Sequence, residues 1–567
     1  MTLSKHVSVE DLEYKNLKKA SKIQLNDREE YIGAYTANQL IPKYSIPENS
    51  VASELVYRTL DEELALDGNP TLNLASFVNT EYTDVQLKLI TENIVKNLAD
   101  NDEYPSLIEI QKRCVSILSN LWHAPVIENE NGRKITNSIG TATTGSSEAI
   151  MLAGLALKKR WQEARKAENK DISNPNIIMA TCAQVALEKF ATYFDVENRL
   201  VEICPESGHL IDVSKIKSKI DENTIGIFVI LGSTFTGAFE PVEEISNLLD
   251  EVEKETKLNI RIHVDGASGG FIAPFVYPHL KWDFRIPRVD SINTSGHKFG
   301  MTTAGLGWVI WKDSSLLPKS LRFSLDYLGG MEETFGLNFS RPGFPVIIQY
   351  YNFLALGKEG FTKIHDASLS NARLLSNILL DSGYFEVLSV IHKPIDKSQQ
   401  SKFYTVEHHA DSTHQNVSNE SFEPGLPVVA FRFSKEIREK YPEIPQSMVS
   451  SLLRKRGFIV PNYHLPPSET DTEILRVVVR RSFSMNLLDK LVAACIETVE
   501  LLIDACENVR SIIAGGAATL DANDKSVIYD LLKTIASAGE ASVAEMKHKS
   551  AKRDEIHKNK KSYRGPC

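Results

Sequence analysis

Two segments of the sequence place a charged side chain among small residues directly after an apolar run. In HVDGASGG (263–270) the charge is the carboxylate of Asp265, and in SGHKFG (295–300) it is the amine of Lys298. Ligands of open α/β sheets bind beyond the carboxyl ends of the strands, so both groups are placed to meet one ligand. Taken singly, Asp265 could simply cap a turn, and a lysine is usually a surface residue.

A third segment, TTGSSEA (143–149), has the residue types of an anion site at the start of a helix. Gly145 lets the backbone approach a ligand closely. Ser146 and Ser147 lie where the first turn of a helix presents N–H groups that have no partner within the helix. The segment could therefore cradle a phosphate, or it could be an ordinary N-cap without a ligand.

Together the three segments supply the parts of a pyridoxal-phosphate site. Lys298 would hold the aldehyde of the cofactor as an imine, and Asp265 would keep the pyridine nitrogen protonated so that the ring can accept electrons. The serine-rich cradle would fix the phosphate. The combination is more specific than any one segment, and it predicts pyridoxal 5'-phosphate as the cofactor.

A fourth segment, YLGGMEETFGLNFSRP (327–342), is rich in glycine and aromatic residues. It could be a mobile loop that closes over a ligand, excludes water and guides protonation. The alternative is an ordinary hairpin on the surface.

The elements around these segments alternate between strand-like and helix-like patterns. Residues 147–166 carry Ile150, Ala153, Leu157 and Trp161 on one helical face. Short apolar runs predict strands at 176–180, 225–231, 260–265, 289–294 and 307–311. Such strands, separated by helix-length stretches, are typical of a mainly parallel sheet covered by helices on both faces, an α/β fold.

The rest of the chain indicates further regions. Residues 346–380 have the pattern of a long helix; beyond a polar stretch, strands at 428–433 and 474–479 and a helix near 487–505 indicate a smaller α+β domain. We therefore expect an N-terminal arm at 1–60, a large cofactor-binding domain at 61–368, a small C-terminal domain at 369–510 and a helical, polar and basic tail at 511–567.

Composition narrows the class of protein. The chain has 567 residues, 42% of them hydrophobic, and a net charge of −10, which argues against nucleic acid as a partner. No apolar run is long enough to span a membrane, and the N-terminus lacks the apolar segment of a secretory signal. Six cysteines without paired spacing indicate reduced thiols and a cytoplasmic protein.

Three histidines, His408, His409 and His414, lie close together in a polar insertion. With no cysteine or paired ligand spacing nearby, they indicate a flexible loop and not a metal site. We therefore expect no metal.

Several strings of the sequence resemble glutamate decarboxylases, most closely the fungal ones. They are LDGNP (66–70), NLASF (73–77), KNLADNDEYP (96–105), TTGSSEA, HVDGASGGF, SGHKFG and NFSRPG (338–343). The likeness is dense over 60–345 and thinner over 346–505. It implies an aspartate-aminotransferase-like pyridoxal-phosphate fold and a homo-oligomer, at least a dimer, whose active sites are shared between subunits.

Matched residue by residue, the resemblance assigns the cofactor site. It implies that Lys298 forms the internal aldimine, that Asp265 binds the pyridine nitrogen and that Gln184 lies over the ring face. The residues that would surround the phosphate and the rest of the cofactor are Gly145, Ser146, Ser147, Ser295, His297 and Thr234, with Ser340 reaching in from the neighbouring subunit.

The resemblance also assigns the substrate pocket. Ser76, Phe77, Asn97 and Asp100 are similar to the residues that hold the distal carboxylate, and Arg476 is similar to the arginine that pairs with the α-carboxylate. A planar guanidinium suits a carboxylate, although Arg476 could be an exposed strand residue and Asp100 part of an acidic surface loop. An aspartate facing a substrate carboxylate needs a shared proton, which fits an enzyme that favours mildly acidic conditions.

The implied activity is decarboxylation of L-glutamate to 4-aminobutyrate and CO2, through aldimine and quinonoid intermediates. One proton is consumed per turnover, which links the reaction to glutamate catabolism and acid stress. The alternatives are a decarboxylase of aspartate or cysteine sulfinate and a catalytically silent homologue that acts by binding. No tryptophan follows Trp311, so calmodulin binding of the plant type is not expected, and the chain ends without the histidine-bearing tail of bacterial members.

Overall fold

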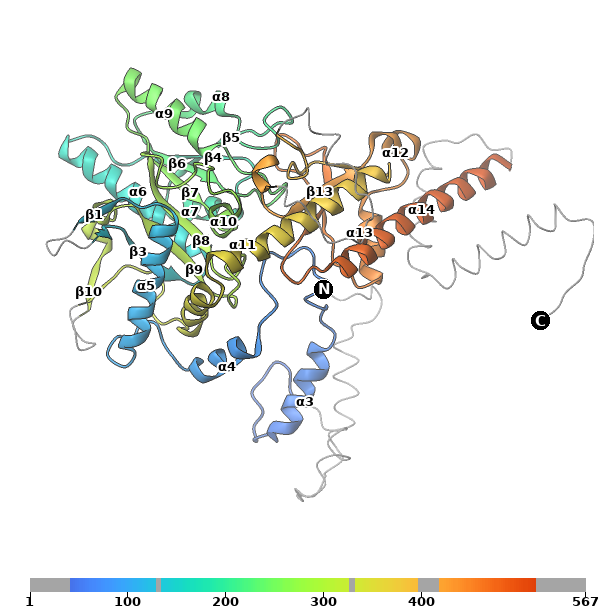
Figure 1. Ribbon diagram of the computed structural model, residues 1–567, viewed down its shortest axis with the longest axis horizontal. Helices are drawn as coiled ribbons and strands as arrows, with labels where there is room; N and C mark the ends of the chain where they lie inside the picture. Colours follow the sequence, from blue (N-terminus) through green and yellow to red (C-terminus); the bar gives the residue numbers. More distant parts are fainter. Residues whose placement is uncertain (1–40, 129–133, 326–331, 396–417, 516–567) are drawn as a thin grey trace, which may run out of the picture. The chain divides into compact units, whose positions relative to one another are not determined.

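The computed structural model describes residues 41–128, 134–325, 332–395 and 418–515 (Figure 1). The chain divides into two compact units, one ending at Asn69 and the other beginning at Pro70. The first unit contains the helix α3 (Ser53–Leu64), with Glu54 in its first turn, where a negative charge is favourable. The sheets and the candidate site all belong to the second unit.

A sheet of seven strands forms the centre of the second unit (Figure 1). Its order is β3-β9-β8-β7-β6-β4-β5, and neighbouring strands are parallel except where β9 is one of the pair. The strands are β3 (Ile139–Thr143), β4 (Asn176–Ala180), β5 (Glu197–Val201), β6 (Thr224–Ile230), β7 (Ile262–Asp265), β8 (Val289–Ser295) and β9 (Gly307–Trp311). Every residue of β4 and of β6 to β9 is buried, as expected for strands covered on both faces. The predicted α/β fold with a mainly parallel sheet is confirmed.

The direction of β9 follows from its short connection to β8. Residues 296–306 alone join the two strands. A parallel crossover needs a dozen or more residues, usually with a helix, so a loop this short favours the antiparallel arrangement.

A β-bulge in β8 sets the register at the end of β7. His263 pairs with Ser291 and Asp265 with Asn293, because Asp290 is an extra residue that shifts the pairing of β8 by one position. A shift of one residue exchanges the side chains of a strand between the two faces of the sheet. The bulge therefore decides which side chains of β8 lie beside Asp265.

Helices pack around the sheet (Figure 1). The longer ones are α5 (Pro105–Leu121), α6 (Ser146–Ala167), α7 (Val185–Tyr193), α9 (Val242–Thr256) and α11 (Phe344–Asp381). The apolar face predicted for 147–166 is found in α6, which buries Ile150, Ala153 and Leu157 and packs on β8 and β9. The predicted long helix is α11, with a kink at Gly357, where φ is 57°, a value that favours glycine.

A second, antiparallel sheet of four strands follows α11. Its order is β12-β13-β15-β14, and its strands are β12 (Phe385–Val387), β13 (Val428–Phe433), β14 (Asn462–His464) and β15 (Glu473–Val478). The helices α13 (Ser447–Lys455) and α14 (Met485–Gly515) pack against each other in the same part of the chain. The strands predicted at 428–433 and 474–479 are therefore present, and their pairing places Arg476 opposite Ala430.

Some predictions fall on residues that the structure does not describe. The structure does not describe residues 327–331 at the start of the glycine-rich segment, the histidines His408, His409 and His414, or most of the basic tail. The strand β10 (Phe323–Leu325), just before the glycine-rich segment, pairs antiparallel with β11 (Glu332–Thr334) within it. Within the described ranges, no helix is both long and apolar enough to cross a membrane.

Candidate active site

A cavity of about 310 Å³ lies at the carboxyl ends of β6, β7 and β8. Parallel strands end at the same edge of a sheet, so residues far apart in the chain meet there. Nine residues that the sequence assigns to the cofactor site line the cavity: Gly145, Ser146, Ser147, Gln184, Thr234, Asp265, Ser295, His297 and Lys298. The tenth, Ser340, does not.

The candidate phosphate cradle lies at the N-terminus of α6. This helix of 22 residues begins at Ser146, so its N–H groups without helical partners and the positive end of its dipole border the cavity. The Oγ atoms of Ser146 and Ser295 lie 2.7 Å apart and share a hydrogen bond. A Cβ on Gly307 would lie 2.4 Å from the carbonyl carbon of Gly145, so glycine allows β9 to pass this close to the cradle. The donors and the space fit a phosphate group.

His297 borders the same cradle. Its Nδ1 accepts a hydrogen bond from the N–H of Leu306 (3.4 Å), and a Cβ on Gly145 would lie 3.6 Å from its Cε1. Burial, and after it the charge of Lys298, lowers the pKa of His297 to about 4. The ring is therefore neutral near pH 7, and its proton is assigned to Nε2, where it can be donated to an anion.

Asp265 is the last residue of β7 and is 4% exposed. Two donors reach its Oδ1, the N–H of Ala267 and the Nδ2 of Asn293, each at 3.0 Å. Because both contacts fall on one oxygen, the other is left for a ligand in the cavity that Asp265 lines. A carboxylate in this position suits a protonated ring nitrogen.

Lys298 lines the same cavity and is half-buried. Its Nζ lies 3.4 Å from Ser268 Oγ and 5.3 Å from the centre of the Phe77 ring. Burial lowers the pKa of the Lys298 amine; the charge of Asp265 opposes this shift and that of Arg476 adds to it. A larger neutral fraction makes the amine a better nucleophile.

Arg476 lies over the same aromatic ring, 4.9 Å from the centre of Phe77. Its Nη1 donates to the carbonyl of Thr234 (2.7 Å) and its Nη2 to the carbonyl of Ala75. Its Nε is buried and has no hydrogen-bond partner among the described residues. A ligand carboxylate would satisfy this donor and offset the burial of the charge. Ser76, next to Phe77 in the chain, is brought to the same part of the molecule.

Asn97, Asp100 and Ser340 lie elsewhere. The Nδ2 of Asn97 donates to Ser340 Oγ (3.2 Å), and its Oδ1 accepts from the N–H of Arg341 (3.1 Å). The Oδ1 of Asp100 accepts from the N–H of Glu103 (3.0 Å). None of these three predicted residues lines the cavity at α6. Within one chain, the structure therefore does not bring them to the candidate cofactor site.

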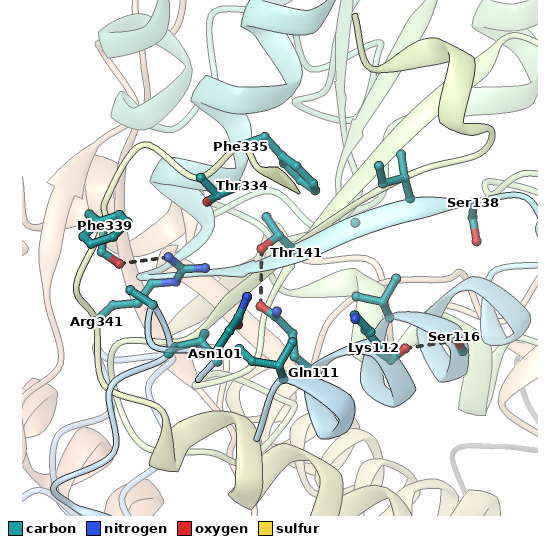
Figure 2. A pocket seen from close by; sticks show the side chains of 16 residues that line it. Asn101, Gln111, Lys112, Ser116, Ser138, Thr141, Thr334, Phe335, Phe339 and Arg341 are labelled. Carbon is teal, nitrogen blue, oxygen red and sulfur yellow. Dashed lines mark hydrogen bonds between the residues drawn. The ribbon is translucent and has the colours of Figure 1, made fainter. Parts of the chain in front are cut away.

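A second cavity, of about 330 Å³, lies beside this group of residues (Figure 2). Figure 2 shows Arg341, which donates to the carbonyl of Phe339, on one side and Gln111, hydrogen-bonded to Thr141, on another. The lining of this cavity shares no residue with the lining of the first one. It also contains none of the residues that the sequence assigns to the site.

Glu148 connects the cradle, through hydrogen bonds, to the segment that carries Ser340. The sequence analysis did not identify Glu148 as a candidate site residue. Its Oε2 accepts from the N–H and the Oγ1 of Thr144 (2.8 and 2.9 Å), and its Oε1 accepts from the N–H groups of Leu337 and Asn338 (3.0 and 3.1 Å). The one signal in the sequence was an acidic residue in the first turn of a predicted helix. That signal indicates only a favourable helix start.

Comparison with known proteins assigns this fold and cavity to a class. A family profile described as "Pyridoxal-dependent decarboxylase conserved domain" matches residues 47–395. The chain therefore belongs to the pyridoxal-dependent decarboxylase family, which confirms pyridoxal 5'-phosphate as the cofactor. The lysine, the aspartate and the cradle that meet in the cavity fit that cofactor.

Within that family, the relatives that align over most of the chain include several glutamate decarboxylases. The glutamate decarboxylase of Saccharomyces cerevisiae is 47% identical over 93% of this chain and 90% of the yeast protein. Glutamate decarboxylase 5 of Arabidopsis thaliana is 40% identical over 88% of this chain and 94% of its own length. The solved structure of the Lactobacillus brevis CGMCC 1306 glutamate decarboxylase covers 83% of this chain and 97% of that protein, with 34% identity and a TM-score of 0.72. The family predicted from the sequence is confirmed.

Proposed function

We propose that this chain is an enzyme that removes the α-carboxylate of L-glutamate and releases 4-aminobutyrate and CO2. The proposal is supported by the relatives named glutamate decarboxylases, which match the chain over most of their length. The observation that carries it is that Lys298 lines one cavity together with Asp265 and lies over the same aromatic ring as Arg476.

The cavity offers partners for the phosphate, the ring nitrogen and the aldehyde of the cofactor. The phosphate would be held by the N-terminus of α6 together with Ser146, Ser147, Ser295 and His297. Asp265 would pair with the ring nitrogen, and Lys298 would be the point of attachment. When bound, the cofactor supplies a carbonyl carbon for the substrate amine and a cationic ring that accepts the electron pair of the broken bond.

Gln184 and Thr234 would complete the surroundings of the cofactor. Gln184 caps α7, and its Oε1 accepts the N–H of Ala186 (2.7 Å), which leaves its Nε2 for the cavity that it lines. We place this amide against the face of the ring. Thr234 lines the cavity as well and holds Arg476 through its carbonyl.

Arg476 would determine the orientation of the bond between the α-carbon and the α-carboxylate, which is the bond that breaks. Two of its nitrogen atoms already donate to backbone carbonyls, so the guanidinium has a fixed position, and its Nε has no hydrogen-bond partner among the described residues and is available to the substrate. A carboxylate held there by Arg476 can be turned so that its bond to the α-carbon stands perpendicular to the ring of the cofactor. One proton is taken up at the α-carbon for each CO2 released.

Asn97, Asp100 and Ser340 would serve the neighbouring subunit in an assembly of at least two chains. Their absence from the lining of the cavity in their own chain supports this assignment. Ser340 would reach the phosphate of the neighbour, and Asn97 and Asp100 would hold the distal carboxylate of its substrate together with Ser76 and Phe77. We also propose a cytoplasmic location, which is supported by the five free cysteines of the described residues.

The choice of substrate is tested with a panel of acidic amino acids. CO2 release from glutamate, aspartate and cysteine sulfinate is measured on the purified protein loaded with pyridoxal 5'-phosphate. Glutamate should exceed the two shorter acids in kcat/KM by at least about 10²-fold, because a shorter side chain leaves the polar groups of the pocket without partners. Equal rates or a preference for aspartate would overturn the assignment to glutamate, and no CO2 from any of them would favour a silent homologue.

A further inference from the structure

Four buried side chains form a continuous series of hydrogen bonds that ends at Asp265. Asn293 Nδ2 lies 3.0 Å from Asp265 Oδ1, and Asn293 Oδ1 lies 2.8 Å from His263 Nε2. The series continues from His263 Nδ1 to Ser291 Oγ, 2.8 Å away. None of the four is more than 4% exposed. His263, Asn293 and Ser291 do not line the cavity, so no step of the proposed reaction uses them directly.

The chemistry of the groups fixes the direction of every bond in this series. A carboxylate only accepts, so the Nδ2 of Asn293 must donate to Asp265. The Oδ1 of Asn293 then accepts, which places the proton of His263 on Nε2. Nδ1 of His263 is left to accept from the hydroxyl of Ser291. All donors therefore point toward Asp265, and hydrogen bonds arranged in this way polarise one another.

The β-bulge in β8 makes this arrangement possible. Residues two apart in a strand share a face of the sheet, as His263 and Asp265 do in β7 and as Ser291 and Asn293 do in β8. The extra residue, Asp290, brings the two pairs opposite each other. If the register of the Ile262–Val289 pair continued without a bulge, Ile292 would lie opposite Asp265.

The protonation state of His263 agrees with the direction of the series. Burial lowers the pKa of His263 to about 4, against the opposing effect of Asp265. The neutral ring has one donor and one acceptor, as the series requires. The charge of Asp265 also contributes to the pKa shifts of Lys298 and Glu240.

We propose that Asn293, His263 and Ser291 are positioning residues that hold the carboxylate of Asp265 in one rotamer, directed at the ring nitrogen of the cofactor. The inference rests on the role proposed for Asp265. It explains why three buried polar residues that do not line the cavity are connected to that carboxylate by hydrogen bonds. Their effect passes through Asp265, because their hydrogen bonds lead to no other group that lines the cavity.

The test compares Asn293→Leu, which ends the series at its first bond, with Thr294→Val in the same strand. Thr294 is as deeply buried, and its Oγ1 has no hydrogen-bond partner among the described residues, so this control removes a polar atom outside the series. The measurements are the Tm of the protein without cofactor, the Kd for the cofactor, the absorbance of the bound cofactor against pH, and kcat and KM. Asn293→Leu should lower kcat by about 10-fold to 100-fold with little change in KM, weaken cofactor binding, and shift the pH transition of the absorbance. Thr294→Val should leave all of these near wild type.

A double-mutant cycle separates this inference from the proposed function. If the series acts through Asp265, adding Asn293→Leu to Asp265→Asn should lower kcat no further than Asp265→Asn does alone. Full activity of Asp265→Asn would instead remove the proposed role of Asp265. Loss of activity in Asp265→Asn with wild-type kcat, Kd and absorbance in Asn293→Leu would overturn the positioning role alone.

His263 and Ser291 provide a second comparison should Asn293→Leu fail to fold. His263→Gln keeps a donor for Asn293 and should retain most of the absorbance signature that His263→Leu loses. Ser291→Ala deletes one hydroxyl at the far end, is the mildest change, and should still shift the pH transition of the bound cofactor. An unshifted transition in Ser291→Ala, together with equal behaviour of the two His263 variants, would also overturn the proposal.

Discussion

Lys298 is the residue on which the proposed chemistry most depends, because its amine would attach the cofactor. Lys298→Ala should abolish CO2 release, a loss of several orders of magnitude, and should lose the borohydride-reducible attachment of the cofactor. Lys298→Arg is the matched control, because it keeps the positive charge beside Phe77 but has no amine that can attach to a carbonyl. Trapping with borohydride followed by peptide mass measurement identifies the attachment site. Either variant with more than about a tenth of wild-type kcat would remove Lys298 from the mechanism.

The buried carboxyl group of Glu240 should make the free energy of unfolding depend on pH. Its Oε2 accepts the N–H of Ile230 (2.6 Å), and burial, together with the charge of Asp265, raises its pKa from 4.5 to about 8. Between these values the folded chain holds a proton that the unfolded chain releases. The free energy of unfolding should therefore fall as pH rises through that window, by at most about 1.4 kcal/mol per pH unit.

Glu240→Gln removes this dependence, because the amide is neutral at every pH. Relative to wild type, the variant should gain stability between pH 5 and pH 8 and show no further gain at higher pH. Urea unfolding at several pH values measures the difference, with the exposed Glu92→Gln as a control. A difference that does not change with pH would contradict the protonated state of Glu240 in the folded chain.

At the scale of elements, the central strands could be predicted from the sequence and the edge strands could not. β6 and β8 are buried along their whole length, so their apolar runs indicated them. β3 and β5 are the two edges of the sheet, and each is only partly buried, so neither has a continuous apolar run. The bulge in β8 depends on the pairing of two strands and has no signal within either. For that reason the sequence could indicate the candidate cofactor residues that follow strands, but not the hydrogen bonds that His263 and Asn293 make behind them.

Asp290, the extra residue of the bulge, also stabilises the sheet through two arginines. Asp290 is 1% exposed and accepts hydrogen bonds from Arg160 (2.5 Å) and from Nε and Nη2 of Arg261 (2.9 and 2.6 Å). Asp290→Ala should lower the free energy of unfolding by about 3 kcal/mol, because it leaves two cations without their carboxylate. Denaturant unfolding measures the loss. The exposed pair of Lys88 and Glu92 is the control, and breaking it should cost less than about 1 kcal/mol; equal losses would contradict the anchoring role of Asp290.

At the scale of the whole molecule, the resemblance assigned Ser340 to the neighbouring subunit but did not say to which chain's site Asn97 and Asp100 belong. Asn97 and Ser340 bind each other, and neither lines the cavity that contains Lys298. Mixing inactive Lys298→Ala chains with inactive Ser340→Trp chains should restore up to about a quarter of wild-type activity, because half of the randomly formed dimers are hybrids with one intact site. Activity is measured after subunit exchange, with each variant alone as the control. No recovery despite proven exchange would show that each site is built from one chain.

Glu148 connects the candidate phosphate cradle to Leu337 and Asn338, just before Ser340, through hydrogen bonds. If Ser340 completes the site of the neighbouring subunit, cofactor bound in the cradle of one chain would order Ser340 of the same chain through Glu148. That Ser340 would then be in place to complete the cofactor site of the neighbour. Uptake of pyridoxal 5'-phosphate should then be cooperative, with a Hill coefficient between about 1 and 2 for a dimer. Glu148→Gln replaces one acceptor oxygen with a donor and should bring the coefficient toward 1. At limiting cofactor, half-loaded dimers would be rare, and the population would divide into dimers with two filled sites and dimers with none.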